Sequence, residues 1–532
     1  MRTVMRDFCI CICAAVLLGA GVAQAALVWD PGQTLGGGGG SGTWDLSPAN
    51  TNWYQASSNT DIAWPNSSSP RDDIVFGGTA GTVAVLPGVG IETTLYAGDI
   101  RFDTAGYVIQ PQTTAAKPMI YIDFTGFSGT GLASSGFATA ATTNNILVNF
   151  RLPSAGRTSY PGDFTTGTGG RLSIFEGGGT LELNRASAYT SVYGFYARGG
   201  TFLLNTNYIR IPTHLYAYGT NLVTPTGPGT IGGIGSTVGW SNLGGSLVIG
   251  DNKARADGIL APGDPLVNDG IGSLTVNHFV KFYNSSDANT LATYQVELAS
   301  GTSYDKLIMQ GTNVGTVAPL DLTFSYNGTD TIYGPALNLN FRGSFDASVG
   351  NFLAVVDNRV APSVAGKAYT IKGTFANAAD NARGAFTNDS GVGFGFVYKY
   401  NVDKDTLGAG NDFGLLMDER VVTAVDGPYT VDSSAVPFSG TVTGGTVASW
   451  AWDYNMDGIA DDSVASPSHD NSYFTSTFGW ELGETYTIKL KTVDSLSVES
   501  WGTASLTLVP EPGTMALLLS GAVLGLLRRR RR

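Results

Sequence analysis

The hydrophobic residues of this chain occur in many short runs rather than in a few long ones. Thr82–Val85, Ile100–Phe102 and Tyr294–Leu298 alternate apolar and polar positions, and such runs are separated by Gly, Asn, Asp and Pro. Alternation with a period of two places every second side chain on the same face of a strand. Outside the two termini, no long segment carries apolar residues at helical spacing. The pattern predicts an all-β protein made of short strands.

A repeat in the middle of the chain indicates how these strands are arranged. Residues 178–184 and 199–205 both read Gly-Gly-Thr, then three positions rich in Leu, then Asn. Thr180 and Thr201 therefore begin two units that lie about one solenoid rung apart. A single rung cannot bury its apolar face alone, so neighbouring rungs must stack. We predict a β-solenoid repeat region over residues 111–420.

The segments on either side of this region have different signatures. In residues 26–110, Trp residues recur next to Asp or at turns. This predicts an N-terminal β-rich cap in which aromatic side chains close the end of the strand stack. Within the cap, Gly36–Gly40 predicts a flexible loop or linker. Residues 421–508 contain alternating strands around the turn at Trp452-Asp453. Their length fits a small immunoglobulin-like β-sandwich.

Several of these segments resemble known families. Residues 26–110, the rungs at Gly258–Gly263 and Gly272–Val276, and the closing motif Gly410–Leu415 resemble passenger domains built from autotransporter-associated β-strand repeats. In the closing motif a Phe replaces the usual Val and a Gly intervenes. This resemblance implies a right-handed parallel β-helix. Residues 421–508 resemble a PKD-like domain, which implies the immunoglobulin-like sandwich.

The first 25 residues predict a secretory signal peptide. Two arginines precede the apolar run Phe8–Val22, and Ala23 and Ala25 form an A-x-A cleavage signal. A basic region, a short apolar region and small residues at the cleavage site are the three parts of such a signal. The three cysteines of the chain all lie inside it, so we expect the mature chain to contain no disulfide.

Residues 509–532 predict a sorting signal with a short transmembrane segment. Pro510, Glu511 and Pro512 precede the apolar run Met515–Leu527, and Arg528–Arg532 follow it. This order resembles the PEP-CTERM sorting signal of Gram-negative bacteria, which an exosortase-type membrane protease recognises. The apolar run is shorter than the roughly 20 residues that span a bilayer. The resemblance implies transient anchoring in the inner membrane, followed by delivery to the cell surface or the extracellular matrix.

The overall charge argues against one class of partner. The chain has 30 basic and 43 acidic residues, which gives a formal net charge of −13. A surface of this sign repels phosphate backbones, so we expect no nucleic-acid partner. The same charge favours solubility outside the cell and loose association with divalent cations.

One acidic segment is a candidate metal site. Oxygen-bearing residues alternate around a glycine as in the first half of a calcium loop: Asp453, Asn455, Asp457, Ile459, Asp461 and Asp462. A twelve-residue calcium loop ends in Glu, whereas Val464 stands at that position here. Asp461 or Asp462 would therefore have to substitute for the missing ligand. Calcium binding and a solvated acidic turn stay open as alternatives.

Other polar residues give no catalytic signal. Asp403–Asp405 and Asp257 predict solvated turns, and the histidines at positions 214, 278 and 469 lack zinc-ligand spacing. The chain contains no G-x-S-x-G, H-E-x-x-H or P-loop motif. We therefore predict no catalytic residue from local motifs. A β-helix can still bring distant carboxylates together, as glycosidases require.

The resemblances imply an exported, non-enzymatic surface or matrix protein with a structural or adhesive role, associated with exopolysaccharide or biofilm. Its expected partners are an exosortase-type membrane protease and an extracellular polysaccharide. The alternative is a β-helix polysaccharide lyase or hydrolase, since this scaffold also hosts such enzymes. A groove lined by converging Asp, Lys or Arg side chains would favour the alternative.

Overall fold

The computed structural model is a mostly β chain that divides into two compact units. The first unit comprises Met1–Asp264, Ser273–Tyr294 and Met309–Pro335, and the second comprises Pro265–Gly272, Gln295–Ile308 and Ala336–Arg532. The structure describes residues 26–67, 72–85, 100–111, 119–122, 146–151, 157–160, 163–166, 170–175, 180–183, 190–191, 195–198, 201–205, 209–211, 214–217, 228–239, 246–250, 258–265, 267–277, 279–285, 291–310, 320–324, 333–359, 363–364, 367–368, 370–510, 519–524 and 529.

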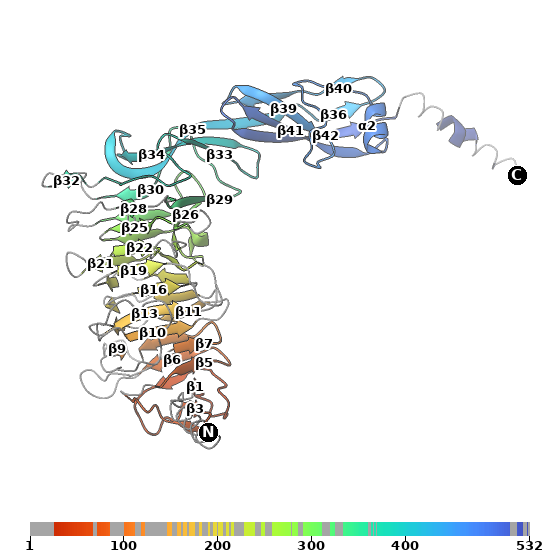
Figure 1. Ribbon diagram of the computed structural model, residues 1–532. Helices are drawn as coiled ribbons and strands as arrows, with labels where there is room; N and C mark the ends of the chain where they lie inside the picture. Colours follow the sequence, from red (N-terminus) through yellow and green to blue (C-terminus); the bar gives the residue numbers. More distant parts are fainter. Residues whose placement is uncertain are drawn as a thin grey trace, which may run out of the picture. The chain divides into compact units, whose positions relative to one another are not determined.

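The first unit is a parallel β-solenoid whose strands lie in three sheets. The strand orders are β28-β25-β22-β19-β16-β13-β10-β7-β5-β1-β3-β4 in one sheet, β2-β6-β8-β11-β14-β17-β20-β23 in the second and β24-β21-β18-β15-β12-β9 in the third. From β7 onward, each successive strand enters the next sheet, so three consecutive strands make one rung. Figure 1 shows these strands stacked in chain order within the unit.

The strands of the solenoid are short, as the broken apolar pattern predicts. They are β1 (Leu27–Trp29), β2 (Gly42–Trp44), β3 (Trp53–Gln55), β4 (Thr60–Ile62), β5 (Ile74–Phe76), β6 (Thr82–Val85), β7 (Ile100–Phe102), β8 (Val108–Pro111), β9 (Met119–Ile122), β10 (Ile146–Arg151), β11 (Arg157–Tyr160), β12 (Asp163–Thr166), β13 (Gly170–Phe175), β14 (Thr180–Leu183), β15 (Thr190–Ser191), β16 (Phe195–Arg198), β17 (Thr201–Leu204), β18 (Ile209–Ile211), β19 (His214–Ala217), β20 (Thr230–Gly233), β21 (Ser236–Gly239), β22 (Ser246–Ile249), β23 (Ile259–Pro262), β24 (Ser273–Val276), β25 (Val280–Tyr283) and β28 (Leu320–Phe324). Two further strands, β26 (Thr293–Leu298) and β27 (Lys306–Met309), have residues in both units.

The register between neighbouring rungs confirms the repeat seen in the sequence. Strand β14 pairs in parallel with β17, and Thr180 lies opposite Thr201. The next rung continues the column, because Thr201 lies opposite Thr230 and Phe202 opposite Ile231. Phe202 and Ile231 are both buried. Equivalent positions of successive rungs thus stack into one apolar core, which confirms the predicted all-β solenoid class.

Aromatic side chains fill the N-terminal end of the first unit. The strand order changes here from parallel to antiparallel, since β1 pairs with β3 and β3 with β4 in antiparallel fashion. Trp29, Trp44, Trp53 and Trp64 are buried against one another and against Phe76. Trp53 lies 5.0 Å from Trp29 and 4.8 Å from Trp64 between ring centroids. The tryptophans that predicted a closed end therefore form a single buried cluster.

The glycine-rich segment Gly36–Gly40 departs from the expected flexible linker. The buried Asp30 carboxylate accepts hydrogen bonds from the backbone N–H groups of Thr34, Gly36, Gly37 and Gly38 at 3.0, 3.3, 3.1 and 3.4 Å. Gly39 has φ of 69°, and a Cβ there would collide with the carbonyl oxygens of Gly77 and Thr79. Glycine is needed for this close approach. The segment is a fixed turn wrapped around one carboxylate.

The second unit contains an antiparallel sheet with the strand order β33-β34-β35-β30. Its strands and helices are η1 (Asn268–Gly270), β29 (Ala336–Phe341), β30 (Phe352–Asn358), β31 (Ser363–Val364), β32 (Lys367–Ala368), β33 (Arg383–Thr387), β34 (Gly393–Val402), β35 (Ala409–Val425), β36 (Tyr429–Val431), β37 (Val436–Pro437), β38 (Gly440–Thr443), β39 (Val447–Asp453), β40 (Ser468–His469), α2 (Asn471–Phe478), β41 (Thr485–Asp494) and β42 (Glu499–Leu508). Strand β35 is 17 residues long and runs without interruption through the predicted boundary at 420/421.

The end of β35, which pairs with β38, and strands β36 to β42 of the second unit form a small β-sandwich. One sheet has the order β36-β42-β41-β39, and β37 pairs with β40. Trp452, Tyr454, Phe438, Phe474 and Ile488 belong to its buried core. The core side chains of this sandwich come from strands, from the adjoining positions 438 and 454, and from α2, a helix that the short apolar pattern did not predict.

The helix α2 is fixed by its two ends. The side chain of Asp470 accepts a hydrogen bond from the backbone N–H of Tyr473 at 3.0 Å, which satisfies one free donor of the first turn. Gly479 ends the helix with φ of 68°, a conformation that favours glycine. Phe474 faces the sandwich core and is fully buried. Capping and one buried ring therefore hold a segment whose own sequence is mostly polar.

The predicted processing signals lie largely outside the described residues. Ala23, Ala25, Glu511 and Pro512 are outside them, whereas Pro510 directly follows the strand region of β42. Residues 519–524 are helical and exposed. Among the residues that the structure describes, none belongs to a helix long and apolar enough to cross a membrane. The signal peptide and the sorting signal stay predictions.

Candidate functional site

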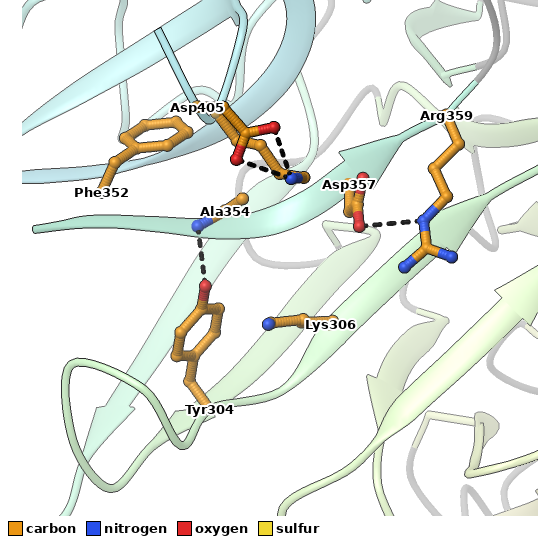
Figure 2. Close-up of a pocket in the computed structure, with 8 residues that line it drawn as sticks. Tyr304, Lys306, Phe352, Ala354, Asp357, Arg359 and Asp405 are labelled. Atoms are coloured by element: carbon orange, nitrogen blue, oxygen red, sulfur yellow. Dashed lines mark hydrogen bonds and ion pairs between the residues drawn. The ribbon is translucent and has the colours of Figure 1, made fainter. Parts of the chain in front are cut away.

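The second unit contains an open pocket of about 590 Å³ lined mainly by charged and aromatic side chains. We call it the Lys306 pocket, and its lining residues are Tyr304, Lys306, Phe352, Ala354, Asp357, Arg359, Lys404 and Asp405. They come from the start of β27, from β30 and the residue after it, and from the turn that joins β34 to β35. Figure 2 shows the labelled side chains around this space.

Backbone hydrogen bonds fix the wall of the pocket that Tyr304 and Lys306 form. The Tyr304 hydroxyl accepts a hydrogen bond from the backbone N–H of Ala354 at 3.1 Å, as Figure 2 shows. Between Tyr304 and Lys306, the buried Asp305 carboxylate accepts from the backbone N–H groups of Gly272 at 2.8 Å and Glu297 at 2.9 Å. Burial raises the pKa of Asp305 to about 7, and these hydrogen bonds only partly offset it.

One carboxylate connects the other two walls of the pocket. Asp412, in the closing motif Gly410–Leu415, accepts from the backbone N–H of Asn358 at 2.7 Å and from that of Lys404 at 2.9 Å. Asn358 stands between Asp357 and Arg359, and Lys404 lies in the opposite turn. The motif therefore positions both sides of the pocket. Burial raises the pKa of Asp412, although both hydrogen bonds act in the other direction.

The pocket gathers positive charge in a strongly acidic chain. Arg359 pairs with Asp357 at 3.0 Å, and Lys404 pairs with Asp405 at 2.9 Å. The Lys306 ammonium lies 4.5 Å from the centroid of the Tyr304 ring. Among the described residues, it has no ion-pair partner. Three cations and two carboxylates thus face one space, and one cation is available to a ligand.

Sequence reasoning missed this pocket because its residues are distant along the chain. It treated Asp403–Asp405 as a solvated turn, and Asp403 does accept turn hydrogen bonds from the backbone N–H groups of Asp405 and Thr406 at 3.0 and 2.8 Å. The neighbouring Lys404 and Asp405 also line the pocket. The signal that could have pointed here was Asp412, the carboxylate of the closing motif Gly410–Leu415.

The candidate calcium loop lies in the sandwich, after β39. Asp453 accepts from the backbone N–H of Gly458 at 3.0 Å, and Asp457 accepts from that of Ile459 at 2.8 Å and from the Asn455 amide at 2.9 Å. Asp461 accepts from the backbone N–H of Tyr454 at 2.7 Å. Burial raises the pKa of Asp461, and the charges of Asp453 and Asp457 add to the effect. These carboxylates therefore share one turn.

Asp462 turns away from this group. Its carboxylate accepts from the Tyr454 hydroxyl at 2.9 Å and contacts His469 Nε2 at 2.6 Å. The buried Oδ1 of Asp453, by contrast, has no hydrogen-bond partner in the described part of the chain. Among those residues, no three His, Cys, Asp or Glu side chains are grouped so as to hold a metal ion. Calcium binding at this loop stays a prediction.

The remaining histidines and the processing residues add nothing to either site. His214 lies in β19, and His278 and Asp257 lie outside the described residues. His469 pairs with Asp462 in the sandwich. The cleavage residues Ala23 and Ala25 lie outside the described residues.

Comparison with known proteins gives one partial similarity. No model of a known protein family matches the chain. A stretch of 167 residues, 30% of the chain, is 32% identical to the adhesin BmaC autotransporter of Brucella suis biovar 1 (strain 1330). The match spans 4% of the length of that adhesin. The similarity thus agrees with an autotransporter-like β-solenoid passenger and covers a small part of a much longer protein.

Proposed function

We propose that this protein is a non-enzymatic surface protein of a Gram-negative bacterium with a structural or adhesive role. The observation that carries the proposal is the stack of parallel rungs in the first unit, together with partial similarity to an autotransporter adhesin. A solenoid presents a long, regular surface, which suits repeated contacts with an extended partner. We propose an extracellular polysaccharide of a matrix or biofilm as that partner.

Retention of cells tests the adhesive role. A Gram-negative host that carries an exosortase would express the full chain, and retention on polysaccharide-coated surfaces would be compared with that of the same host without it. We expect more cells to be retained when the protein is present. Equal retention, with the protein detected at the surface by antibody, would contradict the proposal.

The route to the surface is a separate proposal. It rests on the A-x-A sequence ending at Ala25 and on the Pro510–Pro512 motif ahead of an apolar run and five arginines. An exosortase-type protease would cleave near this motif after transient anchoring in the inner membrane. Intact-mass measurement of the protein recovered from the cell surface should give a chain that begins at Ala26 and has lost the arginines. A mass that retains both ends would exclude this route.

A polysaccharide lyase or hydrolase is the second candidate function. The Lys306 pocket favours this second candidate because Asp, Lys and Arg side chains converge there. The pKa directions of two lining groups argue against their use as general bases. The hydrogen bond with Asp405 raises the pKa of Lys404, and burial raises that of Tyr304, whereas a general base needs a pKa near the working pH. Release of oligosaccharides from uronate or neutral polysaccharides by the purified protein would establish the enzyme.

We further propose that the acidic loop holds a calcium ion. The unpartnered, buried Oδ1 of Asp453 supports it, because a buried carboxylate oxygen without a donor is costly unless a cation approaches. Asp453 would be the first ligand, and the carboxylates of Asp457 and Asp461, which are not grouped around it in the structure, would have to turn toward the ion. Calcium would then cross-link the turn.

Calorimetry with the full chain tests the calcium site. We expect binding heat with calcium, and Asp457→Asn should weaken the affinity about tenfold because one charged ligand is lost. Asp432→Asn is the matched control, since Asp432 caps an exposed turn elsewhere in the sandwich. If the two variants bind calcium equally, or if the unaltered chain gives no heat, the loop is only an acidic turn.

A further inference from the structure

We propose that the Lys306 pocket binds a hexuronate unit of an acidic polysaccharide, with the Lys306 ammonium receiving the sugar carboxylate. The inference rests on the proposed surface function and names the chemical class of the partner. It is built from three features of the pocket: an unpaired cation, carboxylates beside it, and a mouth open to solvent.

The unpaired cation identifies the charge of the ligand. Lys306 is the lining cation without a carboxylate partner among the described residues, whereas Arg359 and Lys404 each pair with an acidic neighbour. The chain as a whole has a net charge of −13, so a positively charged pocket contrasts with its surroundings. An ammonium group attracts a carboxylate more strongly than it attracts a neutral hydroxyl. The pocket thus favours a ligand with one localised negative charge.

The two carboxylates distinguish a sugar acid from a simple anion. Asp357 is buried at the pocket wall, and Asp405 lies across from it on the 403–405 turn. Figure 2 places both carboxylates around the space that Lys306 enters. Sulfate has no hydroxyl group and hydrogen phosphate has only one, so neither anion can donate hydrogen bonds to both carboxylates. The hydroxyls of a sugar can donate hydrogen bonds to them. A hexuronate combines the required carboxylate with several such hydroxyls.

The shape of the pocket suits part of a longer chain. Its volume of about 590 Å³ has room for about two sugar rings. The side chains of Arg359, Lys404 and Asp405 are 50, 38 and 76% exposed, so the mouth is open to solvent. A sugar unit of a longer chain can therefore reach Lys306 from solvent. The half-buried ring of Phe352 supplies an apolar surface beside it.

Binding of trigalacturonate to the purified full chain tests the proposal. The matched ligand is its methyl ester, which keeps the sugar rings and removes the charge. We expect trigalacturonate to bind at least about tenfold more tightly than the ester, since a charged hydrogen bond is lost. Its affinity should also fall as salt is added, because the pocket charges are partly exposed.

Substitution assigns the binding to this pocket. Lys306→Gln should weaken trigalacturonate binding about tenfold or more, whereas Lys491→Gln, which removes the same charge from an exposed pair with Glu499, should leave it unchanged. If Lys306→Gln does not fold, Arg359→Gln at the exposed rim replaces it. Equal affinity for acid and ester, equal effects of the pocket and control variants, or no binding at all would overturn the proposal. These measurements use the protein in solution, so they are independent of export and cell retention.

Discussion

Single carboxylates organise several parts of this protein. Asp30 holds the glycine-rich turn, and Asp412 joins the walls of the Lys306 pocket. In both cases a buried acid accepts backbone N–H groups that would otherwise lack partners. At Asp30, burial disfavours the charged form, but the hydrogen bonds from Thr34, Gly36 and Gly37 outweigh it and hold the pKa below its ordinary value. The charge on such a residue is therefore part of the fold.

The first prediction concerns Asp30. Asp30→Asn should lower the free energy of unfolding of the first unit by about 1–3 kcal/mol, because an amide N–H₂ replaces an oxygen that accepts backbone donors. Thermal unfolding would measure the change. Asp269→Asn serves as control, since the Asp269 side chain is almost fully exposed. Equal shifts in the two variants would contradict the assigned role of Asp30.

The second prediction concerns pH and the carboxyl pair Glu419–Asp494. Burial and the adjoining Asp494 carboxyl raise the pKa of Glu419 to about 7; Arg383 opposes this, and Asp418 adds to it. The folded protein therefore binds a proton that the unfolded chain releases near pH 4.5. Its stabilising contribution is present below that pH and is lost as the pH rises through about 7.

Glu419→Gln should therefore be more stable relative to the unaltered protein at pH 8 than at pH 5. The difference should change by up to about 1 kcal/mol per pH unit between these values. Chemical denaturation at each pH measures it. Glu499→Gln is the control, because Glu499 lies in an exposed pair with Lys491. A difference that stays flat with pH would show that Glu419 titrates normally.

At the scale of elements, β35 is the longest strand of the described chain and has two sets of partners. It pairs with β30 and β34 through its first part and with β38 through Val422–Val425. Near its end, the buried Thr423 hydroxyl lies 2.6 Å from that of Thr492 and 2.5 Å from that of Ser500. Strand β35 therefore belongs to the β33-β34-β35-β30 sheet and, through Thr423, contacts β41 and β42 of the sandwich, so we expect the two sheets to unfold together.

The third prediction tests this coupling. Thr423→Val should lower the free energy of unfolding by about 1 kcal/mol, because two buried hydroxyls lose a shared partner. Hydrogen exchange should then accelerate in β34 as well as in β41. Thr441→Val, on the exposed face of β38, is the control. Faster exchange in β41 alone would mean that the two sheets open separately.

At the scale of the whole molecule, the sequence pattern predicted the features that depend on residues close together in the chain. The spacing of Thr180 and Thr201 identified the rung, and the recurring Trp residues identified a closed end. The turn around Asp30 was misread because glycine content alone does not reveal a carboxylate that orders it. The sequence pattern did not predict helix α2, because its two caps and one buried ring stabilise it rather than a periodic apolar face.

The candidate site was harder to predict for a physical reason. The walls of the Lys306 pocket come from segments around residues 304, 357 and 404, and only folding brings them together. A carboxylate and a lysine in separate turns carry no joint signal in sequence. The acidic loop, by contrast, is contiguous, and its composition was visible at once. Its geometry then separated Asp462, bound to Tyr454 and His469, from the other carboxylates.

The antiparallel strands β3 and β4 at the N-terminal end of the solenoid have a consequence for assembly. Parallel rungs present open backbone edges on which another copy could grow, as in fibrils. Here β4 is only three residues long, begins with the exposed Thr60 and includes Asp61. In the described part of this end, the four packed tryptophans are buried and so are not available to a further layer. We therefore expect the β4 edge of this sheet to resist pairing with another copy, as short and charged edge strands do.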